Sequence, residues 1–139
     1  MMFDLMNRIA VKRAISPVSI ADNTAAVSQV LDMQGACAAA LVIATGSIAD
    51  ADATFTVLME HSDASGSGFT AVPDAELIGT EALAGFQFDD DNECRKIGYK
   101  GSKRYVRATI TPANNASAAL LSAVWITTPQ DQPAPNPPA

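Results

Sequence analysis

Three adjacent residues supply the functional groups of a hydrolase triad. They are His61, Ser62 and Asp63, and they begin a run of turn-forming residues that extends to Gly68. A triad normally takes its nucleophile, its base and its orienting acid from separate elements, so this adjacency is the wrong geometry. We therefore expect a solvated hairpin turn, in which replacing His61 by Ala changes stability by no more than about 0.5 kcal/mol. We also expect that the chain is not an enzyme.

A second chemical candidate is the acidic run 89–93, whose carboxylates are of the kind that binds Ca²⁺. The run lacks the spacing and the glycine of the known calcium loop, which favours a solvated acidic loop or the partner of a basic patch. Gly98 and Gly101 are not followed by a helical pattern, so they indicate a turn and a bulge rather than a phosphate loop. The sequence predicts no metal and no cofactor.

Charge is sorted into two blocks. Residues 49–93 contain eleven acidic residues and no Lys or Arg, whereas residues 94–111 contain six basic residues and no acid. Separate zones of opposite charge suit the recognition of other protein surfaces, because charge pattern sets orientation and partner choice. The basic block resembles a hairpin with a Gly-Ser turn. On its second strand Lys103, Tyr105 and Arg107 share one face, and we expect them to bind an acidic protein surface.

The overall composition excludes some partners. A net charge of −6 argues against a general nucleic-acid binder, although Tyr99 and Tyr105 in the basic block resemble a stacking platform. The longest apolar run, residues 36–44, is far short of the roughly 20 residues of a spanning helix, so no membrane contact is expected. Residues 1–17 show no secretory signal. Cys37 and Cys94 do not suggest a disulfide framework, and we expect buried thiols.

The chain of 139 residues is long enough for one domain, with an extension at each end. We expect an N-terminal arm over residues 1–18, a globular body over 19–128, and an extended tail over 129–139, where five prolines exclude a helix or a central strand. Both extensions are poor at forming a core, so we expect partners to hold them. The residues of the arm predicted to contact a partner are Phe3, Leu5, Met6, Arg8, Ile9, Lys12 and Arg13.

The body is predicted to be all β. Residues 53–60 and 103–111 alternate between apolar and polar side chains, the turn formers of 61–68 separate the first of these from a strand near 69–72, and a short helix or turn is possible at 74–79. Short strands at such intervals predict an antiparallel β-sandwich or barrel.

Two segments, residues 35–45 and 117–127, are apolar on both faces. Each is either a central strand covered on both sides or a strand whose outer face is a subunit interface, and a helix is the rival assignment because both are rich in Ala and Leu. Within 24–44 we favour two strands joined near Asp32–Gly35. Trp125 is expected in the core or as an interface anchor.

The segments 34–35, 41–46, 55–63 and 97–107 together resemble capsid cement, or decoration, proteins of tailed bacteriophages such as the Bordetella podovirus. The resemblance covers roughly residues 30–111 and includes no catalytic signature. It implies a jelly-roll-like β-sandwich, a homodimer, and binding to the outside of the capsid, where the chain would clamp neighbouring major capsid protein subunits. It also implies assembly in the bacterial host cytoplasm.

Two other function classes remain open at this point. The chain could be another phage head or tail part, such as a head–tail joining or tail-tube protein. It could also be a carbohydrate-binding β-sandwich module, for which Trp125, Tyr99 and Tyr105 are the candidate stacking platforms.

Overall fold

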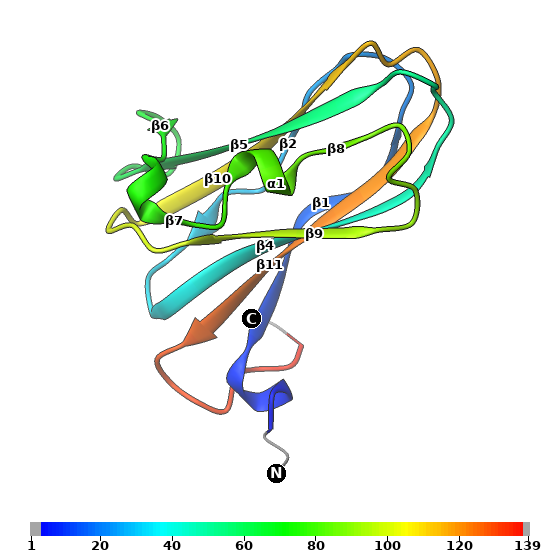
Figure 1. The fold of residues 1–139 in the computed structure, drawn as a ribbon. Coiled ribbons are helices and arrows are strands. Elements are labelled where there is room, and N and C mark those ends of the chain that lie inside the picture. The colour runs from blue at the N-terminus through cyan, green and yellow to red at the C-terminus, as the bar shows by residue number, and fades with distance from the viewer. Residues whose placement is uncertain (1–3, 138–139) are drawn as a thin grey trace.

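The computed structural model describes residues 4–137, and Phe3 of the expected contact residues lies outside this range. The described chain forms two antiparallel sheets that face each other across a common core (Figure 1). The predicted antiparallel β-sandwich is therefore confirmed.

The first sheet has five strands, and three of them are at least eleven residues long. In spatial order they are β1 (Ala10–Ile20), β11 (Ala119–Pro129), β4 (Ala36–Ile48), β9 (Cys94–Tyr99) and β7 (Leu77–Ile78). Every neighbouring pair is antiparallel. The β4 and β11 segments are the two that the sequence shows as apolar on both faces, so the strand assignment is right and the helical alternative is wrong.

The second sheet is built around two strands that pair along their whole length. Its order is β2 (Ala26–Val27), β10 (Tyr105–Ala113), β5 (Thr54–Ser62) and β6 (Thr70–Ala71), while β3 (Leu31–Asp32) pairs with β10 and β8 (Phe86–Gln87) pairs with β5. The helices are η1 (Met6–Arg8), η2 (Asp74–Glu76) and α1 (Glu81–Ala84). Within residues 4–137 no helix has the length and apolarity needed to cross a bilayer.

The core follows from strand alternation, because successive side chains of a strand point to opposite faces. The apolar positions predicted to face inward on β5 and β10 are buried, and the first sheet contributes the two largest buried side chains, Trp125 and Tyr99. The indole Nε1 of Trp125 donates a hydrogen bond to the carbonyl oxygen of Gln29 at 3.1 Å. Its polar atom is thus satisfied inside the core.

The basic block does not form the predicted hairpin. Its first strand, β9, pairs with β4 and β7 in one sheet, and its second strand, β10, pairs with β5 in the other. Both strands have an apolar inward face, and a sandwich buries two such faces by placing them opposite each other. The connection crosses between the sheets at Gly101, which lies so close to the ring of Tyr99 that no Cβ could be accommodated.

The expected N-terminal arm is shorter than residues 1–18. Residues 10–20 form β1, which pairs with β11, and so most of this segment is held by its own domain and not by a partner. The sequence of β1 does not show a regular alternation of apolar and polar residues, because the pairing of β1 with β11 shifts between Arg13 and Ile15 and again between Ile15 and Val18. The tail also contacts its own chain, since the Ala134 N–H donates to the Asn7 carbonyl at 2.7 Å and the two ends lie at the same end of the sandwich (Figure 1).

The two cysteines are exposed thiols, and the expectation of buried thiols is wrong. Cys94 pairs in register with Ala44, seven residues along β4 from Cys37. At a rise of about 3.3 Å per residue this separation is far beyond the reach of a disulfide within one chain.

Two neighbouring leucines on β11 test the assignment of the inner and outer faces. Leu121 is 3% exposed and Leu120 is 45% exposed. Replacing Leu121 by Ala should lower the free energy of unfolding by about 2–5 kcal/mol, because it leaves a cavity, whereas Leu120→Ala should cost about 0.5 kcal/mol or less. Urea unfolding of the two variants measures the difference, and equal losses would contradict the assignment.

Candidate binding surfaces

The segment His61-Ser62-Asp63 is not a solvated turn. His61 is 4% exposed and Ser62 is 3% exposed, so the expectation for His61 is wrong. The Nδ1 atom of His61 lies 2.9 Å from the hydroxyl of Tyr99, and the Ser62 hydroxyl donates to the Ser67 carbonyl. The serine is thus engaged by its own loop, and no hydrogen bond joins it to His61. The hydrogen bonds of His61 and Ser62 stabilise this end of the sandwich, and the two residues do not have the geometry of a catalytic triad.

Tyr99 joins the two sheets at this end through its hydroxyl. The hydroxyl accepts the N–H of Lys103 at 3.2 Å and contacts His61, while a carboxylate oxygen of Glu76 lies 3.4 Å from the same histidine nitrogen. Burial raises the pKa of Tyr99, so its hydroxyl stays protonated at neutral pH. This cluster could not be predicted from a local sequence pattern, because its members come from three separate segments.

The predicted basic patch is neutralised within the chain. Lys103 pairs with Asp63 at 3.1 Å, and Arg107 pairs with Glu60 at 3.1 Å. Arg104 makes two hydrogen bonds of 2.9 Å to the carboxylate of Asp32. The acidic and basic blocks of the sequence therefore meet across the fold.

Aromatic rings engage two of these cations further. The guanidinium of Arg107 lies 4.2 Å from the ring centroid of Phe69, and that of Arg104 lies 5.0 Å from the ring centroid of Tyr105. Both distances fall within the range of cation–π attraction. The structure thus brings Lys103, Tyr105 and Arg107 close together, as expected, but it gives two of them acidic partners in their own chain.

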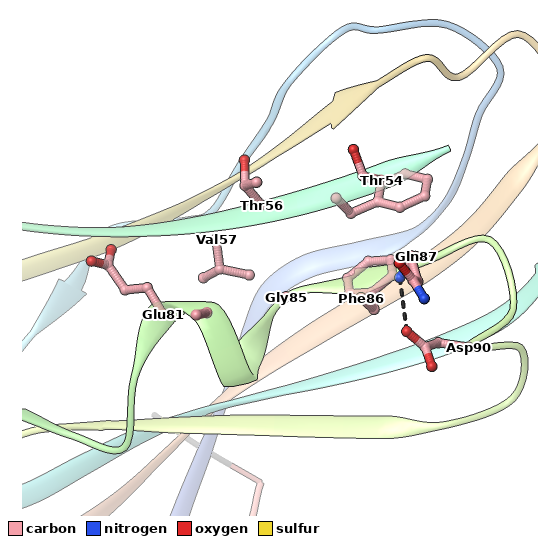
Figure 2. Close-up of a pocket in the computed structure, with 10 residues that line it drawn as sticks. Thr54, Thr56, Val57, Glu81, Gly85, Phe86, Gln87 and Asp90 are labelled. Atoms are coloured by element: carbon pink, nitrogen blue, oxygen red, sulfur yellow. Dashed lines mark hydrogen bonds between the residues drawn. The ribbon is translucent and has the colours of Figure 1, made fainter. Parts of the chain in front are cut away.

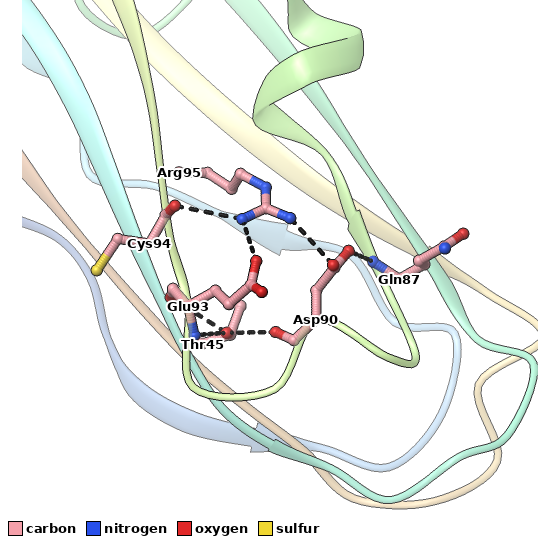
Figure 3. Close-up of polar contacts among 6 residues, drawn as sticks. All are labelled: Thr45, Gln87, Asp90, Glu93, Cys94 and Arg95. Carbon is pink, nitrogen blue, oxygen red and sulfur yellow. Dashed lines mark hydrogen bonds and ion pairs between the residues drawn. The ribbon is translucent and has the colours of Figure 1, made fainter.

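The acidic loop 89–93 is ordered by a basic residue of β9 (Figure 3). Arg95 contacts Asp90 at 3.1 Å and Glu93 at 2.5 Å. The Thr45 hydroxyl donates to the Asp90 carbonyl at 2.7 Å and accepts the N–H of Glu93 at 2.9 Å. Two of the carboxylates are therefore committed to Arg95. Among residues 4–137, no three His, Cys, Asp or Glu side chains are gathered as metal ligands.

A hollow of about 500 Å³ lies between β5 and the segment that contains α1 and β8 (Figure 2). Phe55 and Phe86, which line it, are stacked with ring centroids 4.7 Å apart, and both are buried. A carboxylate oxygen of Glu81 accepts the N–H of Met59 at 2.6 Å, and Asp90 accepts the N–H of Gln87 at 2.8 Å. Its acidic groups already bond to the backbone, so the hollow is better explained as part of the fold than as a ligand site.

The remaining contact residues of the predicted arm are split by the fold. Leu5 and Met6 are more than 60% exposed, and Arg8 is also exposed, at or beside η1. Ile9 is half-buried, whereas Lys12 and Arg13 are exposed on β1. The last two therefore belong to the edge of the five-stranded sheet and not to a separate arm.

An apolar surface lies on the outward side of the five-stranded sheet, which we call the outer face. No element of the described chain covers it, and several of its large side chains are well exposed, including Ile78 at 59% and Val11 at 42%. It is formed by Val11 on β1, Leu120, Val124 and Ile126 on β11, Ala40 and Val42 on β4, and Ile78 on β7. Segments 35–45 and 117–127 are therefore not strands that the described chain covers on both sides. That their outer face is a subunit interface stays a prediction.

Two glycines of the outer face leave room for large side chains on the neighbouring strands. A Cβ on Gly46 would lie 2.9 Å from the Cβ of Leu120, and a Cβ on Gly98 would lie 3.0 Å from that of Ile78. The two large side chains therefore lie across neighbouring glycines instead of standing out from the sheet. A shallow hollow of about 410 Å³ lies beside the irregular part of β1 and is lined by Pro17, Ser122 and neighbouring residues.

No protein-family model matches the chain, and no curated protein is significantly similar to it in sequence. Among solved structures, the CBM22-1–GH10 modules of a Clostridium thermocellum endo-1,4-β-D-xylanase (Xyn10B), complexed with xylohexaose, are similar with a TM-score of 0.53 and 12% identity over 88% of this chain. This chain spans about a quarter of that protein's length, at 26%. A xylan-binding domain from CBM22 has a TM-score of 0.39 at 8% identity. The similarity to the xylanase modules, at a TM-score of 0.53, shows a shared β-sandwich fold.

Replacing His61 by Ala should destabilise the protein by about 1–3 kcal/mol, because the buried Tyr99 hydroxyl loses a partner and a cavity remains. Asp63→Ala is the matched control. The side chain of Asp63 is 80% exposed, so losing its ion pair with Lys103 should cost less than about 1 kcal/mol. Thermal unfolding compares the two variants, and a negligible effect of His61→Ala would restore the solvated-turn interpretation.

The ion pair of Arg104 predicts a pH effect. Its hydrogen bonds hold the pKa of Asp32 below the ordinary value of 3.8. A lowered pKa contributes stability above the ordinary value, and this contribution disappears as the pH falls through the lowered pKa. Arg104→Ala should raise the pKa of Asp32, as measured by carboxyl NMR titration, and should destabilise the protein near neutral pH more than in acid. Lys100→Ala should leave the Asp32 titration unchanged.

Proposed function

We propose that this chain is a structural, non-catalytic protein that binds the outside of a phage capsid and cements neighbouring major capsid protein subunits. The observation that carries the proposal is the outer face, an apolar sheet surface that no element of residues 4–137 covers. Exposed apolar patches of this kind mark protein-interaction sites. The resemblance of residues 30–111 to phage cement proteins suggests which kind of assembly would cover it.

The geometry suits a cement protein better than a catalyst. A cement protein stabilises a shell by binding the assembled state, so that its binding free energy adds to the stability of that state. Such binding needs contact area, and the uncovered apolar side chains of the outer face can supply it. The centre of the face is formed by two long, paired strands, β4 and β11, and a surface that is ordered before binding loses less conformational entropy when it binds.

A carbohydrate-binding function has less support from the side chains. Trp125 and Tyr99, two of the three candidate stacking platforms, are each 1% exposed and point into the core. The third, Tyr105, lies beside the guanidinium of Arg104. A sugar ring needs an open aromatic face, which the buried rings of Trp125 and Tyr99 lack, and at Tyr105 a sugar would have to share the ring with Arg104.

The proposal is tested with empty podovirus shells that lack their own cement protein. Purified chain should co-sediment with the shells to saturation and should raise the temperature at which they break. Val42→Asn, a neutral change on the outer face, should weaken binding by about tenfold or more, because an apolar contact is lost. Leu58→Asn is the control, since Leu58 is a 40% exposed residue of the opposite sheet.

A shell affinity that is undetectable for the unmodified chain would overturn the proposed function. An affinity gel containing xylan provides the comparison with the carbohydrate-binding alternative. We expect no retardation in this gel, and retardation that Val42→Asn leaves intact would favour that alternative.

A further inference from the structure

The five-stranded sheet contains no acidic residue. Strands β1, β11, β4, β9 and β7 together hold four cations and not one Asp or Glu, although the chain as a whole has 15 acidic and 9 basic residues. The cations are Lys12, Arg13, Arg95 and Lys96. The acidic excess of the protein is therefore confined to the other sheet, the loops and the ends.

Two of these cations belong to the outer face. Arg13 pairs in register with Val124, Val124 pairs with Val42, and Val42 pairs with Lys96. Residues in register share a face, so the row runs Arg13, Val124, Val42, Lys96 across four neighbouring strands. At about 4.8 Å between strands, the two cations flank an apolar centre about 14 Å wide.

Neither cation has an acidic partner in the part of the chain that the structure describes. Within residues 4–137 no carboxylate lies within ion-pair distance of Arg13 or Lys96, and the one side-chain hydrogen bond of Arg13 goes to the Ser16 hydroxyl at 3.2 Å. By contrast, Arg95, Lys103, Arg104 and Arg107 all have acidic partners. The fold therefore pairs four cations of the basic block with acids and leaves the two cations of the outer face without an ion pair among residues 4–137.

We propose that the outer face docks on another protein whose surface is apolar at its centre and bears carboxylates opposite Arg13 and Lys96. This inference rests on the proposed function, in which that protein is the capsid subunit, and it adds the chemistry that the subunit must present. The shallow hollow lined by Pro17 and Ser122 would receive an apolar side chain of the partner. Complementary charge at the margins sets register, while the apolar centre supplies the contact.

A second copy of this chain fits the face poorly. A closed dimer uses the same patch on both subunits, so the interface would contain Arg13 and Lys96 from each chain and no acid from either. Like charges that face each other across an interface are unfavourable. If the chain forms the dimer that its resemblance to cement proteins implies, it should use another surface.

A membrane or a nucleic acid fits poorly as well. The aromatic residues of the five strands are Trp125 and Tyr99, both buried, so the face has no aromatic ring for an interfacial belt or for base stacking. Two cations are also few for a surface of phosphates, and the net charge of −6 repels it.

The sign of a single charge distinguishes these partners. Val124 lies between the two cations in the row and is 39% exposed, so Val124→Glu and Val124→Lys remove the same apolar contact and differ in charge. On the cement-free shells, Val124→Glu should bind about tenfold or more weakly than Val124→Lys, because the new carboxylate would lie close to the carboxylates that the partner places opposite Arg13 and Lys96. Leu58→Glu and Leu58→Lys on the opposite sheet should bind alike. Thermal unfolding of all four variants confirms that each is folded.

A second measurement removes the cations. The double variant Arg13→Gln, Lys96→Gln should lose affinity for shells and should depend less on salt than the unmodified chain, since exposed charge pairs are screened. If the unmodified chain binds shells but Val124→Glu binds as well as Val124→Lys, the inference fails and the proposed function stands. If the unmodified chain does not bind, the proposed function fails first.

Two solution experiments test the other occupants. In sedimentation velocity at low salt, self-association strengthened by Val124→Glu would show that the face meets a second copy, and this would overturn the inference. Binding to phosphatidylserine vesicles that the double variant abolishes would also overturn it. We expect position 124 to leave the oligomeric state unchanged and the vesicles to remain unbound.

Discussion

The pairing of β4 with β11 is the interaction on which the rest of the structure depends. These strands lie side by side at the centre of the five-stranded sheet, and their alternation sends Leu41, Ile43 and Trp125 into the core while Val42 and Val124 point outward. A shift of one residue would reverse both sets. The same pairing that closes the core therefore also creates the uncovered apolar face, because most outward-facing residues of both strands are apolar.

The fold places most cations of the basic block next to carboxylates, because a charged group near the core is costly without a partner. The basic block of β9 and β10 meets acids from the loops and from β5, and Arg95, Lys103, Arg104 and Arg107 are each paired. These pairs are partly exposed and individually contribute little to stability. Their main consequence is the distribution of charge on the surface. They neutralise one part of the surface and leave the outer face cationic.

The β-sandwich by itself does not define a function, because the same fold supports many. The likeness to xylanase-associated modules is a likeness of fold at 12% identity, and two of the three candidate residues for stacking on a sugar, Trp125 and Tyr99, are buried in this chain. What distinguishes this sandwich is the apolar outer face of its five-stranded sheet. We therefore base the proposed function on that surface and not on the fold.

The sequence by itself determined the class of fold and the inward faces of β5 and β10, because alternation at 53–60 and 103–111 is a local pattern that burial enforces directly. It also showed that 35–45 and 117–127 are apolar on both sides, without deciding what lies outside them. Only the tertiary structure decided that β9 and β10 belong to different sheets, that His61 is buried against Tyr99, and that β1 is a strand. Each of these depends on contacts between residues far apart in the chain, and a local pattern of side chains contains no information on which distant segment will supply the partner.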